Sequence, residues 1–445
     1  MKQRFGTATA FAIVVGSMVG TGVFTSLGYQ LVEFESGFPL MLLWVVGGIC
    51  AFCGAVSYCE LAAAIPRSGG EYTFLGKAFH PSVGFTAGWI SFTVGFSAPA
   101  ALVAMTFGAY INASFSWINP TLAGIGLILV VTALHAYSHR SSGSFQALFT
   151  FVKIALIVLF CGAAYVLVEM PQQVSFLPQS VDLNHVVSGG FAVSLIYVNY
   201  AYAGWNATTY VTEEFNQPTL AINRALMAGT GTVLILYLFL NGTFLAVAPT
   251  DAMKGQIEVG FIAAQYAFGD IGAQLMSLML AIILISTLSA MILAGPRVLS
   301  RIGNDYPVLR WLGRTNRHDV PGIAIATQSA LAIVFILSGT FDSILLFAGL
   351  LLGMSAFSTV SASIWMRVKY GKPERYRMPF YPLPPIVFLL VTGWAITHTM
   401  IERAVEGVFA AIMIAVGLSL YALVKFFNNC RFLNCETPTK QNLSQ

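Results

Sequence analysis

Two short stretches rich in glycine and aromatic residues have the composition of a small-molecule binding site. They are GSMVGTG at 16–22 and NYAYAGWN at 199–206, and each lies inside a long apolar segment. Glycine interrupts a helix easily, and an interrupted helix leaves backbone N–H and C=O groups without partners in the helix. N–H groups at the start of a half-helix attract an anion, and freed carbonyl oxygens attract an ammonium. The two stretches together predict a site for a ligand that carries both charges.

Each stretch also has a simpler interpretation. Gly16 and Gly20 have the spacing of small residues that lets helices pack closely, and Tyr200 and Tyr202 are equally suited to packing. The stretches fall in the first and the sixth apolar segment, an offset of five. Broken helices at matching positions of two repeats typically form a binding site, so this offset favours a binding site.

Lys153 is a further chemical signal, because it lies within the fifth apolar segment. With a rise of about 1.5 Å per residue it is roughly 14 Å deep, too far for its ammonium to reach the surface easily. No acid is near it in that segment, so the carbonyls of Gly16 and Ser17 at the first interruption are the expected acceptors. The alternative is a lysine that only fixes helix packing.

The composition requires a lipid bilayer around these residues. Only 9% of the 445 residues are charged, against about 25% in a soluble domain, and 57% are apolar. With a mean hydropathy of +0.77, a soluble fold could not cover its surface with polar side chains. The chain is therefore expected to be an all-α membrane protein. A soluble enzyme and a disordered chain are excluded, and the net charge of +4 requires no nucleic-acid partner.

Twelve apolar segments are long enough to cross a hydrocarbon core of about 30 Å. They predict twelve transmembrane helices, at 6–32, 38–64, 84–112, 119–138, 144–168, 187–214, 222–248, 270–300, 321–338, 342–364, 382–401 and 405–427. The offset of five predicts a five-plus-five inverted repeat with helices 1 and 6 broken. The expected organisation is a first repeat at 1–168, a second at 187–364, helices eleven and twelve at 382–427, and a tail at 428–445.

The distribution of Lys and Arg predicts the orientation. All 22 of these residues except Lys153, Lys254 and Arg403 fall on the side of the two termini. The positive-inside rule therefore places the N-terminus, the C-terminus and the 428–445 tail in the cytoplasm.

Four motifs resemble those of the amino acid, polyamine and organocation transporter superfamily, and most of all its L-type and prokaryotic amino acid transporter branch. They are GSMVGTGVF at 16–24, YCELAAAIPRSGGEYTFLGKAF at 58–79, YAYAGWNATTYVTEEF at 200–215 and GPRVLSRIGNDYPVL at 295–309. The resemblance covers the first ten segments, and the last two match only by hydropathy. It implies the twelve-helix inverted-repeat fold and transport of amino acids by alternating access in the cell (inner) membrane.

The resemblance also implies roles for single residues. The substrate carboxylate would meet the backbone around Gly20, Thr21 and Gly22, where the family usually has Ser in place of Thr21. The site is completed by an aromatic lid and by carbonyls for the substrate ammonium: the lid would be Tyr202, and the carbonyls those around Met18, Tyr200, Ala201 and Ala203. Lys153 would stand where sodium-coupled relatives bind sodium, which implies sodium-independent transport.

The charged residues near the two interruptions indicate the charge of the substrate's side chain. A cationic side chain would need a carboxylate, because an unpaired charge at mid-membrane is costly. The sequence has no carboxylate in either stretch, and Asn206 occupies a position where polyamine and agmatine carriers of the superfamily tend to have Glu. A neutral amino acid is the expected substrate.

Charged residues at helix ends complete the candidate set. Two acids end the sixth segment and two arginines end the eighth, and they are candidates for a cytoplasmic gate or for a solvated cluster of helix ends: Glu213, Glu214, Arg297 and Arg301. Glu60 is expected to form a structural pair with Arg67 or another loop cation. The six cysteines are expected to be free thiols, because their spacing does not suggest a disulfide framework.

The leading hypothesis is a secondary transporter of neutral amino acids, either an exchanger or a proton-coupled symporter. The alternative in the same class is an antiporter of polyamines or cationic amino acids. A membrane-embedded enzyme would need convergent catalytic side chains, and a channel would not need matched broken helices. We therefore expect no enzyme activity, no cofactor and no metal, and the sequence leaves homo-oligomerisation open.

Overall fold

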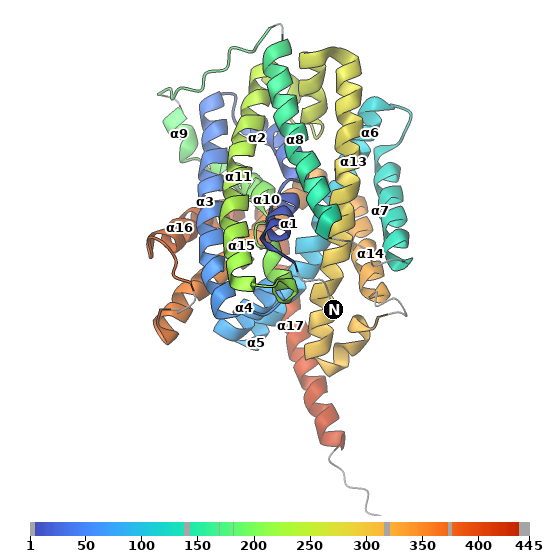
Figure 1. Cartoon of the computed structure of the whole chain (residues 1–445), viewed down its shortest axis with the longest axis vertical. Helices are drawn as coiled ribbons and strands as arrows, with labels where there is room; N and C mark the ends of the chain where they lie inside the picture. The colour runs from blue at the N-terminus through green and yellow to red at the C-terminus, as the bar shows by residue number, and fades with distance from the viewer. Residues whose placement is uncertain are drawn as a thin grey trace, which may run out of the picture.

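The computed structural model describes residues 5–137, 143–168, 170–180, 182–315, 321–372 and 376–435. Within these ranges the chain is mostly helical and contains no strand longer than a single bridge between Phe5 and Phe215. Most of the long helices run roughly along the vertical axis of Figure 1 and form one bundle. The all-α class expected from composition is confirmed.

Nine apolar stretches of helix in the described chain are long enough to cross a membrane. Seven of them lie in the helices α3 (Gly37–Ala64), α8 (Gly143–Leu167), α11 (Pro218–Val247), α13 (Val259–Asp305), α15 (Phe341–Tyr370), α16 (Leu383–Glu402) and α17 (Ala404–Cys435). Two shorter apolar helices, α7 (Pro120–Tyr137) and α14 (Gly322–Ser338), match the fourth and ninth predicted segments.

The first apolar segment is interrupted, as the sequence predicts. It contains α1 (Thr7–Met18) and α2 (Gly22–Glu33), and Val19 leaves the helical conformation with ψ 85°. The break therefore occupies 19–21.

The sixth segment is also interrupted, and here one glycine is required. Helix α10 (Gly189–Tyr202) ends where Ala203 becomes extended, and the 3-10 helix η2 (Ala207–Glu214) follows. Gly204 between them has φ +104°, in the left-handed region that favours glycine.

The third segment differs from the expectation of a simple helix. Its parts are α5 (Pro81–Ile90), a π-helical turn η1 (Ser91–Ser97) and α6 (Ala98–Ser114), whose first turn contains Pro99. A proline has no N–H to donate to the preceding turn, so the hydrogen-bond ladder changes there. A short helix, α4 (Gly70–Ala78), lies between α3 and α5 outside the candidate spans.

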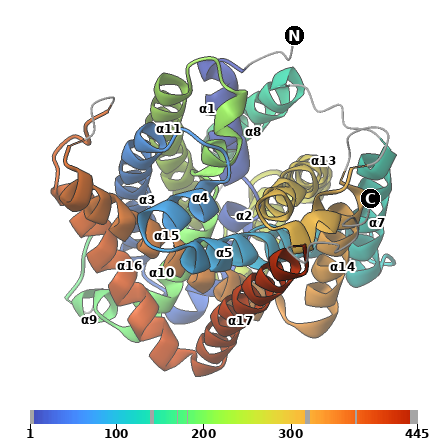
Figure 2. The same ribbon diagram turned by 90° about the horizontal axis from the view of Figure 1, so that it is seen from below.

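The two interrupted segments lie inside the bundle. Helix α10 packs against α2, α3, α15 and α16, and α1 packs against α8 and α11. In the view from below, α2 lies near the centre, surrounded by the longer helices (Figure 2). The interruptions are thus buried in protein, where broken backbone can be satisfied.

Part of the predicted orientation rests on residues outside the described ranges. These are Lys2, Arg4, Arg140, Arg317, Arg375 and Lys440, together with the tail beyond residue 435.

Candidate functional site

A cavity of about 290 Å³ lies where the two helix interruptions meet. All of the predicted substrate-binding residues line it: Met18, Gly20, Thr21, Gly22, Tyr200, Ala201, Tyr202, Ala203 and Asn206. Helices α13 and α15 close other sides with small and apolar residues such as Ala290 and Gly353. The structure therefore brings the two sequence stretches together around one space.

The interruptions touch each other directly. A Cβ atom on Gly22 would lie 2.6 Å from Cα of Ala201, which is closer than such atoms approach. A Cβ atom on Gly204 would lie 2.8 Å from the carbonyl oxygen of Ser17. Glycine is needed at both positions so that the two backbones can come this close.

The first interruption exposes N–H groups suited to an anion. Gly20 N–H donates back to the Met18 carbonyl at 2.8 Å, and Phe24 N–H donates to Thr21 O at 3.0 Å. Within the described chain, the N–H groups of Thr21, Gly22 and Val23 make no backbone hydrogen bond. They form the start of the 12-residue helix α2, where unpaired N–H groups and the helix dipole favour a carboxylate.

Tyr237 on α11 places its hydroxyl between carbonyls of the two interruptions. Its hydroxyl lies 2.6 Å from the Met18 carbonyl oxygen and 2.9 Å from that of Ala201. The Met18 carbonyl also accepts from Gly20 N–H, while the single hydroxyl hydrogen of Tyr237 is shared between Met18 O and Ala201 O. Two protein donors therefore already reach Met18 O, the oxygen expected to meet the substrate ammonium.

Sequence reasoning missed Tyr237. A tyrosine within an apolar helix gives no local sign that its hydroxyl bridges two broken backbones, although a buried hydroxyl always needs a partner.

The ring of Tyr202, the expected aromatic lid, is fixed by contacts within the protein. Its side chain is fully buried, its hydroxyl donates to the Trp44 carbonyl at 3.1 Å, and its ring packs 4.9 Å from that of Tyr237. The ring is thus held between α3 and α11. Tyr200 keeps 7% of its surface exposed and also lines the cavity, so it is the better placed aromatic residue.

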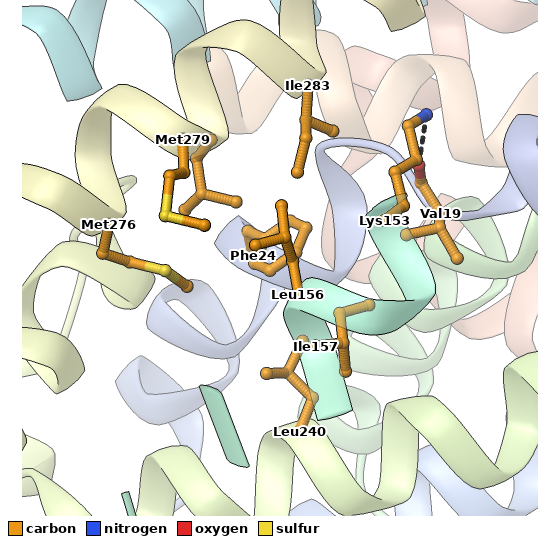
Figure 3. Close-up of a pocket in the computed structure, with 10 residues that line it drawn as sticks. Val19, Phe24, Lys153, Leu156, Ile157, Leu240, Met276, Met279 and Ile283 are labelled. Carbon is orange, nitrogen blue, oxygen red and sulfur yellow. Dashed lines mark hydrogen bonds between the residues drawn. The ribbon is translucent and has the colours of Figure 1, made fainter. Parts of the chain in front are cut away.

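Lys153 is buried on α8 with its ammonium at the first interruption. Nζ donates to Gly16 O at 3.1 Å, to Val19 O at 2.9 Å and to Thr287 Oγ1 at 2.9 Å. Figure 3 shows the bond to Val19. Gly16 is an acceptor as expected, whereas Ser17 is not, because the Ser17 carbonyl lies against Gly204.

A small apolar cavity of about 10 Å³ lies beside Lys153 (Figure 3). Side chains from α8 and α13, among them Leu156, Met279 and Ile283, line it. The polar surroundings of Lys153 are thus confined to its ammonium, which two carbonyl oxygens and one hydroxyl oxygen accept.

A carboxylate lies at the second interruption, contrary to the sequence expectation. Glu71 on α4 lines the cavity and is only 2% exposed. Its Oε1 accepts from Asn206 Nδ2 at 3.1 Å and from the Tyr58 hydroxyl at 2.6 Å, and its Oε2 accepts from the Ser355 hydroxyl at 2.6 Å. The sequence could not indicate this because 135 residues separate Glu71 from Asn206.

Half of the predicted gate forms an ion pair. Arg297 Nη1 and Glu214 Oε1 are 2.7 Å apart, and both residues line the cavity. Arg301 instead pairs with Asp305 at 3.6 Å, one helical turn along α13. Glu213 is exposed and joins no described ion pair, because η2 presents only one of the two adjacent acids to Arg297.

The chain segment before α1 is tied to the end of η2 near this pair. Phe5 N–H donates to Glu214 O at 2.8 Å, and Asn216 N–H donates to Phe5 O at 3.1 Å. The rings of Phe5 and Phe215 pack edge to face at 6.1 Å. Backbone hydrogen bonds therefore join the start of the first interrupted segment to the end of the second.

Glu60 and the described cysteines lie outside the cavity lining. Glu60 forms a structural pair as expected, but its partner is Arg367 on α15 at 2.9 Å instead of Arg67, since α3 packs beside α15. Four cysteines are free thiols as expected, namely Cys50, Cys53, Cys59 and Cys161. The side chains of Cys430 and Cys435 lie outside the described residues.

Known proteins similar to this chain are transporters. A family model described as amino acid permease matches residues 5–424. The b(0,+)-type amino acid transporter 1 of Mus musculus is 26% identical, over 96% of this chain and 89% of the relative. The serine/threonine exchanger SteT of Bacillus subtilis is 25% identical, over 95% and 96%. The large neutral amino acids transporter small subunit 2 of Homo sapiens is 26% identical, over 95% and 80%.

Proposed function

The chain belongs to the amino acid permease family, and from this premise we propose that it is a sodium-independent secondary transporter of neutral amino acids that works by alternating access. The observation that carries the proposal is the cavity of about 290 Å³ between the two helix interruptions. An amino acid carries a carboxylate and an ammonium, and this cavity has helix-start N–H groups and freed carbonyls on its walls.

The proposed binding mode follows from which backbone groups remain available. The substrate carboxylate binds the N–H groups of Thr21, Gly22 and Val23 at the start of α2. Its ammonium binds the carbonyls around Tyr200, Ala201 and Ala203, where a carbonyl with one protein donor keeps a second lone pair. Tyr200 covers the bound molecule.

The proposed substrate class rests on the charges along the cavity. Glu71 is nearly closed off by three donors, and Arg297 is paired with Glu214. A cationic side chain therefore meets no open carboxylate, and burying it unpaired would be costly. Two of the relatives are named for neutral substrates, serine/threonine and large neutral amino acids.

Sodium independence is proposed from Lys153. Its ammonium occupies the oxygen-lined space formed by Gly16, Val19 and Thr287. A cation already held by these oxygens leaves none of them for sodium.

The same proposal includes the arrangement in the membrane. Twelve helices cross the cell membrane, and they include inverted repeats at 1–168 and 187–364. Both termini lie in the cytoplasm. The Arg297–Glu214 pair closes the cytoplasmic end of the cavity in one state and opens in the other.

Transport by purified protein in liposomes tests the proposal. Uptake of radiolabelled serine, leucine and lysine is measured with and without internal amino acid, in sodium and in choline buffer. The expected result is uptake of neutral amino acids that is unchanged when choline replaces sodium. Uptake of lysine alone, or uptake that needs a sodium gradient, would contradict it, and stimulation by internal amino acid identifies exchange.

A further inference from the structure

We propose that Glu71 is a proton-binding residue whose charge state determines how firmly the second helix interruption is held, a role that rests on the proposed transport function. Glu71 is neither one of the proposed substrate-binding residues nor one of the gate residues.

Glu71 joins four separate parts of the chain. It extends from the first turn of α4 and accepts hydrogen bonds from Tyr58 on α3, Ser355 on α15 and Asn206 at the second interruption. Asn206 directly precedes η2, which carries Glu214 of the ion pair with Arg297. The Glu71 carboxyl therefore links the residue before η2 to helices α3 and α15 of the surrounding bundle.

The charge of this carboxyl has no cationic partner in the described chain. Its three donors are neutral, and none of the ion pairs found among the described residues includes it. A buried carboxylate without a cation is costly, and the usual solution is to bind a proton. The side chain is 2% exposed, so a bulky cation cannot reach it without displacing a donor, whereas a proton can.

The elements packed against α4 supply no other charge to compensate it. Helix α5 contains no titratable residue. On α15, Asp342 and Arg367 are roughly 18 Å or more along the helix from Ser355. On η2, Tyr210 is neutral, Glu213 is exposed and Glu214 is paired.

On α3, Glu60 is paired with Arg367. The titratable residue of α3 that contacts the Glu71 carboxyl is Tyr58. Within α4 itself, the Tyr72 hydroxyl donates to Asp305, and Lys77 follows Glu71 by more than a helical turn. The nearest titratable groups are thus two tyrosines, Tyr58 and Tyr210, which are uncharged near neutral pH.

Burial raises the pKa of the Glu71 carboxyl above its usual value, while the hydrogen bonds from Ser355, Tyr58 and Asn206 act in the opposite direction. The net shift is upward, which brings the carboxyl's titration nearer to neutral pH.

Protonation keeps the hydrogen bonds but removes the charge that strengthens them. A protonated Oε2 can donate to the Ser355 hydroxyl, while Oε1 still accepts from Asn206 and Tyr58. Hydrogen bonds to an ionised acceptor are roughly twice as strong as those to a neutral one. The ionised form therefore holds Asn206 and η2 more firmly, and protonation loosens them for the movement that opens the cavity.

Two measurements on the full-length protein test the inference, one direct and one functional. Infrared difference spectra recorded at increasing pH, from the ordinary range of a carboxyl upward, should show a protonated carboxyl band. The Glu71 contribution to this band should be absent in Glu71→Gln and present in Glu258→Gln. Glu258 is a second acid whose pKa is raised by burial, and it does not line the cavity. Asn206→Ala removes one bond that favours the carboxylate and should move the midpoint of the band to higher pH.

The functional measurement is exchange of labelled amino acid in liposomes over the same pH range. The wild-type rate should rise as pH falls, by about threefold or more, whereas Glu71→Gln should change by less than about 1.5-fold, because its amide cannot titrate. Glu258→Gln should respond like the wild type. A Glu71→Gln protein with the full pH response, or an infrared band unaffected by both Glu71→Gln and Asn206→Ala, would overturn the inference.

Failure of the proposed function gives a different pattern. Wild-type liposomes would then exchange no amino acid at any pH, while the infrared titration still reports whether Glu71 binds a proton. If Glu71→Gln does not fold, the shifted midpoint in Asn206→Ala decides, and an unshifted midpoint contradicts the proposal.

Discussion

Gly22 and Ala201 are in backbone contact, because a Cβ atom on Gly22 would lie 2.6 Å from the Ala201 Cα. One residue begins the second half of the first interrupted segment, and the other lies in the last turn of α10. The two interruptions therefore support each other at the point where they form the cavity.

Replacing Gly22 should disrupt this contact. Gly22→Val is expected to abolish substrate binding, because the added side chain both pushes α2 from α10 and occupies the space before the N–H groups. The measurement is the thermal stabilisation by added amino acid. Gly20→Ala is the control for folding, since its Cβ would lie 3.6 Å from Thr287 Cγ2, an ordinary contact. Normal binding by Gly22→Val would refute the proposed site.

Removal of the Tyr237 hydroxyl should weaken both interruptions together. Tyr237→Phe withdraws the donor to Met18 O and Ala201 O, and the expected loss of stability is about 1 to 2 kcal/mol. Unfolding in detergent measures it, and Tyr165→Phe on the exposed face of α8 is the control. Equal stability of both variants would show that the bridging hydroxyl contributes nothing.

Lys153→Met should slow transport while the protein still folds. The substitution keeps the buried chain but leaves Gly16 O and Val19 O without their donor. A loss of about 1.4 kcal/mol in the step that needs this arrangement slows it about tenfold. Liposome exchange measures the effect, with Lys254→Met, from a half-exposed ion pair, as the control. An unchanged rate would remove Lys153 from the mechanism.

Cysteine labelling tests the proposed orientation. In a background without native cysteines, Lys254→Cys should react with an impermeant thiol reagent added to intact cells, and Lys372→Cys should not. The reason is the excess of Lys and Arg on the side of the termini. Labelling of the residue-372 variant in intact cells would reverse the orientation.

Glu71 should make stability fall as pH rises. Its pKa is raised in the folded protein, so between the unfolded and folded pKa values the folded state holds a proton that the unfolded chain has released. The stabilisation from that proton is present below the pKa of the unfolded chain. It is lost as the pH rises through the pKa of Glu71 in the folded protein. Melting temperatures across pH should therefore fall more steeply for the wild type than for Glu71→Gln. Parallel curves would contradict the raised pKa.

The sequence by itself determined the environment, the helices and the places where two of them break. A low fraction of charged residues requires a bilayer, and long apolar runs require helices there. The glycines at 16–22 and the stretch at 199–206 mark the interruptions because backbone freedom is a local property. Lys153 could be assigned to the first interruption for a similar reason, since a deeply buried ammonium needs oxygen acceptors and few are free in a membrane.

Only the tertiary structure decided which groups share a contact. Tyr202 faces α3 and α11 because of the rotation of α10 about its axis, which an apolar segment of uniform composition does not encode. Glu71 meets Asn206, Tyr237 meets Met18 and Glu60 meets Arg367 because helices distant in sequence are neighbours in the bundle. Hydrogen bonds and ion pairs form over about 3 Å, so their partners depend on the packing of every helix around them, whereas composition and local backbone preference do not.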